Sequence, residues 1–210
     1  MYGIKGQGWF VSFHVFTKYV KVTFFRGTSL QPVPPGGTGN DALVGGAAGD
    51  LLIGGAGFDQ LFGAASSDLF RFNGLGDATD KILDFTTTGG NADTVQLGAP
   101  GFSLQNQAGA GGASMVDAGV AASSIAGADI VRWTGPAGSM DSAAEVNAML
   151  AGKASTFAGG VFVLGFDATG KVALWYDDSA NNAASSVTMV ATFDNLTSTA
   201  TFSGSNFLFV

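Results

Sequence analysis

A chain of 210 residues, 46% of them hydrophobic, is long enough to bury a core in one large or two small domains. The absence of cysteine excludes disulfides and thiolate chemistry, and a net charge of −7 argues against nucleic acid as a partner, since phosphate binding needs lysine and arginine. No apolar run reaches the roughly 18–20 residues of a membrane-spanning helix, so we expect no transmembrane segment.

The charge divides the chain at a proline-rich segment, residues 32–35. Residues 1–35 contain four basic residues and no acid, whereas residues 36–210 contain five basic and 16 acidic residues. Alternating apolar and polar residues at 9–16 and 19–25 predict a β-hairpin, and the polar residues within 9–16 do not favour a signal peptide. Residues 2–35 resemble an internal fragment of an unrelated small bacterial domain of unknown function, which implies a fusion or a misplaced start.

Residues 36–80 repeat a pattern of nine residues. Asp41, Asp50, Asp59, Asp68 and Asp77 follow one another at this fixed interval. The five copies read GGTGNDALV, GGAAGDLLI, GGAGFDQLF, GAASSDLFR and FNGLGDATD. A flexible glycine-rich linker is the alternative, but a linker has no reason to keep an acid at a fixed interval.

Each part of the repeat has a physical role. Paired glycines allow positive φ and close backbone approach in a tight turn, whose carbonyl groups can point inward. An aspartate at the sixth position adds a carboxylate, which completes the hard oxygen ligand set that Ca²⁺ prefers. The eighth position is apolar in four copies and predicts a buried column: Leu43, Leu52, Leu61 and Phe70.

The pattern G-G-x-G-x-D-x-U-x resembles the nonapeptide repeats of the hemolysin-type (RTX) calcium-binding family. The resemblance implies a parallel β-roll in which two nonapeptides form one coil and calcium lies between repeats n and n+2. It implies these metal-binding residues: Gly37, Gly39, Asp41, Gly46, Ala48, Asp50, Gly55, Gly57, Asp59 and Asp68. Ala48 stands where the family has a glycine.

By this resemblance, one calcium site lies between Asp41 and Asp59 and another between Asp50 and Asp68. The second pair is compromised, because the fourth copy has alanine and serine where glycines are expected. A third pair, Asp59 with Asp77, has lost a glycine and the apolar residue of the repeat. We therefore expect Asp77 to mark the end of the roll.

Residues 81–85 and 91–97 resemble the strands that close the roll in RTX proteins. Residues 98–128 are rich in glycine, alanine and serine and predict a long surface excursion. Ser142 and Glu145 form a capping box for one helix, which we expect to end at Gly152.

The last fifty residues predict antiparallel β structure. Residues 161–166 and 171–176 flank a turn and predict a hairpin, with further strands at 187–193 and 206–210. The expected fold class is therefore mainly all-β: a short parallel β-roll at 36–80 and an antiparallel β cap with one helix at 81–210. An N-terminal hairpin fragment at 1–35 precedes them.

Catalytic motifs are absent from the sequence. His14 is the one histidine, which excludes a zinc site of several histidines, and neither H-E-x-x-H nor G-x-S-x-G occurs. The glycine-rich repeats lack the G-K-[ST] of a phosphate-binding loop. Residues 177–182 faintly resemble a calcium loop, but a polar hairpin loop is favoured. We predict that the chain is not an enzyme.

The C-terminus, residues 206–210, is a polar residue followed by four apolar ones. It resembles the uncleaved tail that type I secretion machinery recognises, which implies a secreted, extracellular protein; the same residues also predict a final strand.

The leading hypothesis is a non-catalytic calcium-binding RTX module of a type I secreted bacterial protein, folding on calcium outside the cell. One alternative is the C-terminal accessory or secretion domain of an extracellular hydrolase, protease- or lipase-like, whose catalytic part is absent from this chain. Another is an adhesive surface protein with a binding face in residues 98–128.

Overall fold

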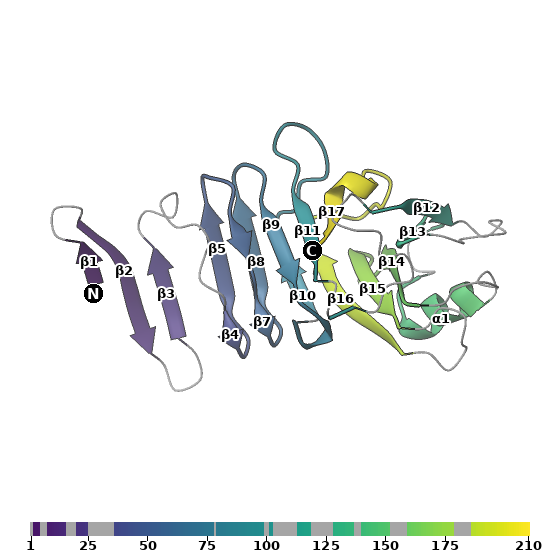
Figure 1. Ribbon diagram of the computed structural model, residues 1–210, viewed down its shortest axis with the longest axis horizontal. Helices are drawn as coiled ribbons and strands as arrows, with labels where there is room; N and C mark the ends of the chain where they lie inside the picture. Colours follow the sequence, from purple (N-terminus) through teal and green to yellow (C-terminus); the bar gives the residue numbers. More distant parts are fainter. Residues whose placement is uncertain are drawn as a thin grey trace.

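The computed structural model describes residues 2–4, 8–15, 20–24, 36–77, 79–98, 101–102, 113–118, 128–136, 140–151, 159–178 and 186–210. The fold is mainly all-β, as expected, with parallel and antiparallel sheets (Figure 1). Within these described residues there is one α-helix, α1 (Ala143–Ala151). None of their helices is long and apolar enough to cross a membrane.

The N-terminal strands form a separate antiparallel sheet, β1 (Tyr2–Ile4), β2 (Gly8–Val15) and β3 (Val20–Phe24). The pairing of β2 with β3 confirms the predicted hairpin, and β1 adds a strand that the sequence did not predict. The proline-rich segment 32–35 lies outside the described residues.

The nonapeptides form the coils of a parallel β-roll. Their strands are β4 (Gly37–Thr38), β5 (Ala42–Gly46), β6 (Leu51–Leu52), β7 (Gly55–Ala56), β8 (Gln60–Ala64) and β9 (Leu69–Phe72). Strands β4, β5 and β6 pair in parallel with β7, β8 and β9, which follow them by two nonapeptides. One coil of the roll is thus two repeats long.

The eighth position of each repeat points into the roll, as predicted. Leu43 pairs with Leu61 and Leu52 with Phe70, and all four side chains are buried. Side chains alternate along a strand, so the ninth position points outward: Val44 is 59% exposed. Each buried leucine or phenylalanine contributes about 1.5–3 kcal/mol of hydrophobic stabilisation.

The roll continues beyond residue 80, where the sequence predicted a domain boundary. Strand β10 (Asp80–Ile82) pairs with β8, and β11 (Thr94–Leu97) pairs with β9. The β10 strand then pairs with β16 (Val187–Phe193), and β11 with β17 (Phe207–Phe209). Both sheets of the roll therefore extend without interruption into the C-terminal part of the chain (Figure 1).

The remaining C-terminal strands are β12 (Met115–Ala118), β13 (Ile130–Trp133), β14 (Val161–Phe166) and β15 (Val172–Asp177). The predicted hairpin is present as β14 and β15, and β15 also pairs antiparallel with β16. The other pairings differ from the antiparallel expectation. Strands β12, β13 and β14 are parallel, and β17 is parallel to β11, whose neighbour β9 also runs in that direction.

The helix begins as its sequence predicts. The Ser142 hydroxyl donates to the Glu145 carboxylate at 2.9 Å and accepts the Glu145 N–H at 3.4 Å, which forms the capping box. Val146 and Leu150 are buried on one side. The predicted stop at Gly152 lies outside the described residues.

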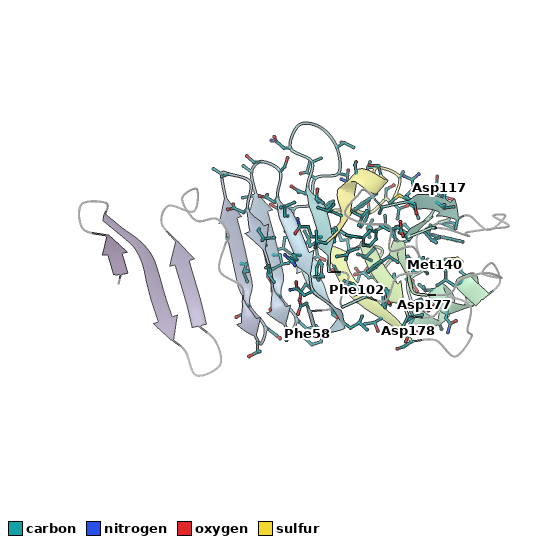
Figure 2. All side chains as sticks on the ribbon, in the orientation of Figure 1. Phe58, Phe102, Asp117, Met140, Asp177 and Asp178 are labelled. Carbon is teal, nitrogen blue, oxygen red and sulfur yellow. The ribbon has the colours of Figure 1, made fainter. Side chains whose placement is uncertain are left out.

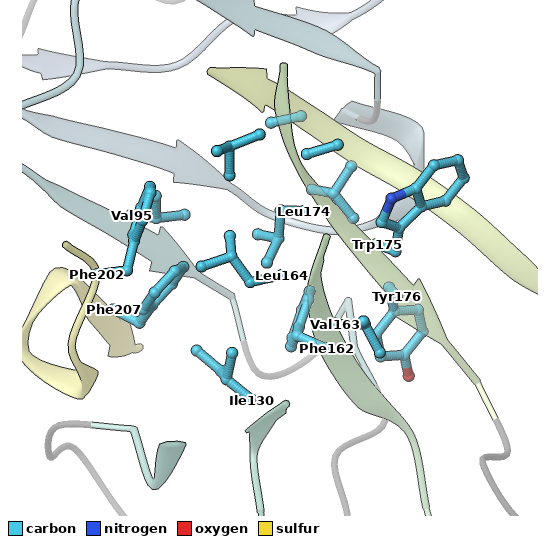
Figure 3. Packing of buried hydrophobic residues seen from close by; sticks show 14 of the residues in the cluster. Val95, Ile130, Phe162, Val163, Leu164, Leu174, Trp175, Tyr176, Phe202 and Phe207 are labelled. Atoms are coloured by element: carbon cyan, nitrogen blue, oxygen red, sulfur yellow. The ribbon is translucent and has the colours of Figure 1, made fainter. Parts of the chain in front are cut away.

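Phenylalanines fill the space where the roll meets the C-terminal strands. The Phe85 ring lies 5.8, 4.9 and 5.5 Å from the rings of Phe70, Phe193 and Phe202, measured between centroids. Phe202 in turn stacks on Phe207, close to Val95 of β11 (Figure 3). The core of the roll and that of the C-terminal part are therefore continuous.

The prediction that residues 98–128 form a surface excursion is wrong at Phe102 and at residues 115–118. Phe102, labelled in Figure 2, is fully buried. Its ring centroid lies about 5 Å from those of Phe162 and Tyr176. Residues 115–118 form strand β12. Burial of one large aromatic side chain outweighs the low hydrophobicity of the residues around it. Residues 103–112 and 119–127 lie outside the described residues.

Candidate metal centre

Aspartates of successive coils are stacked in two columns. In each column, the backbone N–H of one aspartate donates to Oδ1 of the next, at 2.6 to 2.9 Å. The first column consists of Asp41, Asp59 and Asp80, and the second of Asp50, Asp68 and Asp93. The structure thus brings Asp41 next to Asp59 and Asp50 next to Asp68, the two pairs that the sequence predicted.

Asp80 occupies the position that the nine-residue interval assigned to Asp77. The Asp59 N–H donates to Asp80 Oδ1 at 2.9 Å, across 21 residues. Asp77 lies in the 3₁₀ turn Leu75–Asp77 and accepts the backbone N–H and the side-chain amide of Asn73 instead. The fifth copy therefore forms an insertion rather than a coil, and the predicted end of the roll at Asp77 is wrong.

A local signal for the missed aspartates exists in the sequence. In every coil, the aspartate is followed two residues later by an inward apolar residue. Asp80 precedes Ile82 and Asp93 precedes Val95 in the same way, and both apolar side chains are fully buried. Counting this D-x-apolar unit, instead of a fixed interval of nine, would have identified both aspartates.

The first column contains buried carboxylate oxygens that no hydrogen bond satisfies. Oδ2 of Asp41, Asp59 and Asp80 is buried and has no partner. A Cβ placed on Gly54 would lie 2.5 Å from Asp59 Oδ2 and 2.6 Å from Asp80 Oδ2. These two oxygens therefore converge on the same small space beside Gly54, which exists because that residue has no side chain.

At the pair Asp41–Asp59 of the first column, Gly54 contributes its backbone carbonyl group. A Cβ on Gly36 would lie 2.9 Å from Asp41 Oδ2 and would collide with the carbonyl oxygen of Gly54. The Asp41 carboxylate and the Gly54 carbonyl thus face one another beside Gly36.

The second column has one open pair, which contains buried carboxylate oxygens without a partner, and one closed pair, in which protein donors occupy the second carboxylate. Both carboxylate oxygens of Asp50 are buried without a partner, and a Cβ on Gly45 would lie 2.7 Å from Asp50 Oδ2 and from the Gly63 carbonyl oxygen. Asp93, in contrast, accepts the N–H of Asp68 on Oδ1 and that of Thr86 on Oδ2. Protein donors therefore satisfy the Asp93 carboxylate, and the open position lies between Asp50 and Asp68.

The predicted glycines and the first-position glycines have different roles. Positive φ is found at the predicted Gly37, Gly39, Gly46, Gly55 and Gly57, which shape the turns. Among the described residues, Ala48 is not one with positive φ, in agreement with its side chain. The residues that lie against the carboxylates are the first glycines of the first four copies, which the sequence reasoning missed: Gly36, Gly45, Gly54 and Gly63.

The fourth turn keeps the positive φ angles of a glycine turn, although alanine and serine replace two of its glycines. Ala64 and Ser66 have φ of 76° and 80°, in the left-handed region that costs a side-chain-bearing residue roughly 1–2 kcal/mol. The Asp84 carboxylate accepts the N–H groups of Gly63 and Ala64 at 3.0 and 2.7 Å and holds this turn in place. Asp84 therefore shapes the turn beside the second column, a role that the sequence reasoning missed.

Burial makes the columns electrostatically unfavourable without a counter-charge. The pKa of Asp68 is raised to about 6 and that of Asp80 to about 7, mainly by burial; neighbouring aspartates add to the rise, and the hydrogen bond that each carboxylate accepts from a backbone N–H opposes it. The pKa values of Asp41, Asp50 and Asp59 are also raised, again mainly by burial. Stacked carboxylates of like charge favour either protonation or a bound cation.

The chemistry of the open pairs fits calcium. The donors are carboxylate and carbonyl oxygens, and Ca²⁺ takes six to eight such ligands in irregular arrangements, whereas Mg²⁺ requires near-ideal octahedral geometry. Within the described residues, no three acidic, histidine or cysteine side chains form one cluster. Each pair therefore offers at most two carboxylates, and a calcium ion there would need backbone carbonyl groups of the turns as its further ligands.

Among the other described residues, Asp129 Oδ1 is also buried without a partner, but Asp129 lies outside both columns and its Oδ2 accepts the N–H and the hydroxyl of Ser114 at 2.9 and 2.8 Å. A surface pocket of about 250 Å³ is lined by Arg132, Thr134 and Thr199, but the Arg132 guanidinium makes a bidentate pair with Asp117 at 2.7 and 2.8 Å. In the predicted loop at 177–182, the Asp178 carboxylate accepts the Ser186 N–H, as in a polar hairpin loop; residues 179–185 lie outside the described residues.

Comparison with known protein families gives no match, and a search of characterised proteins finds no sequence of significant similarity.

Proposed function

We propose that the chain is a non-catalytic calcium-binding module of the hemolysin-type (RTX) kind, belonging to a type I secreted bacterial protein and folding when it binds calcium. The observation that carries this proposal is the set of buried, unpartnered carboxylate oxygens at successive coils. Burying a charged group without a partner is strongly unfavourable, so when these aspartates are ionised the set favours a ligand of opposite charge.

Three pairs would hold calcium. They are Asp41 with Asp59, Asp59 with Asp80, and Asp50 with Asp68, each beside a first-position glycine. The pair Asp68 and Asp93 would not, because the Thr86 N–H already occupies Asp93 Oδ2. We therefore expect three calcium ions per chain.

Bound calcium supplies the positive charge that the columns lack. Without it, each coil must order its backbone, at roughly 1–2 kcal/mol per residue, while its carboxylates repel one another. One site filled at a hundredfold excess over Kd contributes about 2.7 kcal/mol of stability. Extracellular calcium modules have Kd on the order of 10⁻⁴–10⁻³ M, so the chain would stay unfolded in calcium-poor cytosol and fold outside the cell.

The secreted location and the type I machinery as partner are supported by the sequence of residues 206–210 together with the repeats. Secretion of a reporter fused to residues 36–210 by a host that carries a type I exporter tests this part of the proposal. Loss of export after deletion of residues 206–210 is expected, and undiminished export would contradict it.

The calcium sites are tested by Asp80→Asn, with Asp77→Asn as the matched control. Isothermal titration calorimetry should count one calcium fewer in Asp80→Asn, because Asp80 lies in the first column. Asp77→Asn should keep three, because Asp77 contacts Asn73 outside the columns. Equal counts in both variants, or no bound calcium in the unmodified chain, would refute the proposal.

A further inference from the structure

Asn73 and Gly74 lie at the start of the insertion that interrupts the nine-residue repeat. Of the nine asparagines in the chain, Asn73 is the one that glycine follows. Glycine has no side chain to obstruct the approach of its own nitrogen to the preceding side-chain amide, and it has wide backbone freedom. Asn73 is also exposed to solvent, so water reaches its amide. The sequence therefore makes attack by the next backbone nitrogen easiest at this asparagine.

Charged groups hold both ends of the Asn73 side-chain amide. The Arg71 guanidinium donates from Nε to Asn73 Oδ1 at 2.9 Å. Asn73 Nδ2 donates to Asp77 Oδ2 at 3.0 Å, and the same carboxylate oxygen accepts the Asn73 N–H at 2.9 Å. The amide carbon thus has a positive group at its oxygen and a carboxylate at its nitrogen.

The Gly74 backbone nitrogen is the neighbouring nucleophile. The Gly74 carbonyl oxygen accepts the Asp77 N–H at 3.1 Å, which closes the turn and keeps Asp77 near the amide. Within the described part of the chain, the Gly74 N–H donates no hydrogen bond to a protein acceptor. No such bond must therefore break before this nitrogen loses its proton and attacks.

We propose that Asn73 is a site of deamidation that the chain itself promotes through Arg71 and Asp77. The Gly74 nitrogen attacks Asn73 Cγ, and the Arg71 guanidinium stabilises the negative charge that develops on Oδ1. A bond forms between Cγ and the Gly74 nitrogen, which closes a cyclic imide, and the bond between Cγ and Nδ2 breaks. The Asp77 carboxylate passes the proton lost by Gly74 to Nδ2, which leaves as ammonia.

Water then opens the imide in one of two ways. Hydrolysis at Cγ gives aspartate at position 73. Hydrolysis at the main-chain carbonyl carbon gives isoaspartate, in which the main chain continues through the former side chain. Both steps are acyl transfers without oxidation or reduction, and water is the one co-reactant. The inference does not depend on calcium or on the proposed function.

The isoaspartate product would not fit the surrounding backbone. A Cβ on Gly98 would lie 3.1 Å from Asn73 Cα, and one on Gly101 would collide with the Asn73 carbonyl oxygen. The Gly98 N–H also donates to the Phe72 carbonyl oxygen at 2.8 Å, beside the pairing of β9 with β11. An extra main-chain methylene at residue 73 must displace these contacts. Deamidation would therefore accumulate with the age of the folded chain and loosen the second sheet of the roll.

Peptide mass spectrometry of the full chain, incubated in calcium at neutral pH, tests the proposal. Asn91 is the internal reference, because it is also exposed but is followed by alanine. Asn73 should deamidate at least about tenfold faster than Asn91, and labelling by isoaspartyl methyltransferase should find isoaspartate at residue 73. Its rate in the folded chain should also exceed its rate in the urea-unfolded chain, which has lost both contacts. Equal rates at the two asparagines, or a slower rate in the folded chain, would overturn the proposal.

Two variants test the assisting groups. Arg71→Gln and Asp77→Asn should each slow the deamidation of Asn73 by about tenfold, because each removes a group that stabilises charge or moves a proton. Asp178→Asn, a matched control far from Asn73 in the sequence, should leave the rate unchanged. Unchanged or faster deamidation in both variants would show that the contacts only restrain the amide, which would overturn the assisted route.

Urea unfolding of fresh and aged chains tests the consequence. The aged chain should unfold at lower urea concentration than the fresh chain, whereas Asn73→Gln should lose less stability on the same incubation. An aged chain that contains isoaspartate at residue 73 and unfolds like the fresh chain would contradict the expected loss of packing.

Discussion

Residue types at single turn positions decide how well each coil of the roll forms. Ala64 and Ser66 adopt positive φ, a conformation that glycine takes without steric cost. Ala48 holds the position equivalent to Ser66 in the second copy, but it is not among the described residues with positive φ. Replacement by glycine should therefore have one effect on stability at Ala64 and Ser66 and the opposite effect at Ala48.

Ala64→Gly and Ser66→Gly should each stabilise the calcium-bound chain, by up to about 1 kcal/mol, because relief of strain exceeds the entropic cost of glycine. Ala48→Gly, the control, should destabilise it by roughly 0.5–1 kcal/mol. Urea unfolding in saturating calcium measures all three. Destabilisation by the first two substitutions would show that the turn is not strained.

Gly54→Ala should remove calcium sites and destabilise the fold. A Cβ there would lie within 2.6 Å of carboxylate oxygens of Asp59 and Asp80, so the column must shift. The expected cost is about 1–3 kcal/mol, with a lower calcium count by calorimetry. Gly76→Ala is the control, since its Cβ would meet nothing within 4 Å. If both variants bind calcium like the unmodified chain, the carboxylates are not arranged around Gly54 as described.

The calcium-free chain should be more stable in acid. The folded-state pKa of Asp80 is about 7 and that of Asp68 about 6, both above the ordinary value of 3.8. The stabilising protonated form is therefore present at low pH, and its contribution is lost as the pH rises through these values. Circular dichroism in calcium-free buffer should show more β structure at about pH 5 than at about pH 8, and Asp80→Asn should reduce the difference. Loss of β structure on acidification would contradict this sign.

At the scale of elements, the sequence predicts what is encoded locally. Strands β5 and β8 and the pairs Asp41–Asp59 and Asp50–Asp68 follow from the repeat, because turn, carboxylate and inward residue all lie within nine residues. The helix start follows from its capping box for the same reason.

Elements positioned by distant contacts could not be predicted in this way. The 3₁₀ turn Leu75–Asp77 inserts extra residues between coils, so Asp80 and Asp93 do not follow the nine-residue interval of the repeats. Asp84 accepts backbone N–H groups of a turn some 20 residues earlier in the chain. Strand β17 pairs with β11, more than 100 residues before it, and only tertiary packing selects this parallel partner.

Phe85 packs between the roll and the C-terminal part, so its replacement should cause one of the largest losses of stability in the core. Its ring contacts Phe70 of the roll as well as Phe193 and Phe202 of the C-terminal part. Phe85→Ala should destabilise the calcium-bound chain by about 3–5 kcal/mol in urea unfolding. Phe58→Ala, at a side chain that is 64% exposed, should stay within about 0.5 kcal/mol. Similar effects of the two substitutions would argue against a continuous core.

At the scale of the whole molecule, the roll is a short stack built onto a larger sheet structure. Its coils contact mainly their neighbours, and such stacks gain stability from each added interface. Here the last coil is completed by β16 and β17, which come from the end of the chain. The roll and the C-terminal part should therefore unfold together, and both should depend on the charge balance in the aspartate columns.

Calcium-driven folding of the roll is tested by calcium titration of the full chain, followed by circular dichroism, with reversal by chelator. Added calcium should produce a large, cooperative and reversible gain of β structure at roughly millimolar concentration or below. Magnesium at the same concentration should not reproduce it, because it requires an octahedral site. A chain equally folded in chelator and in calcium at neutral pH would contradict the central claim that calcium drives the folding of the roll.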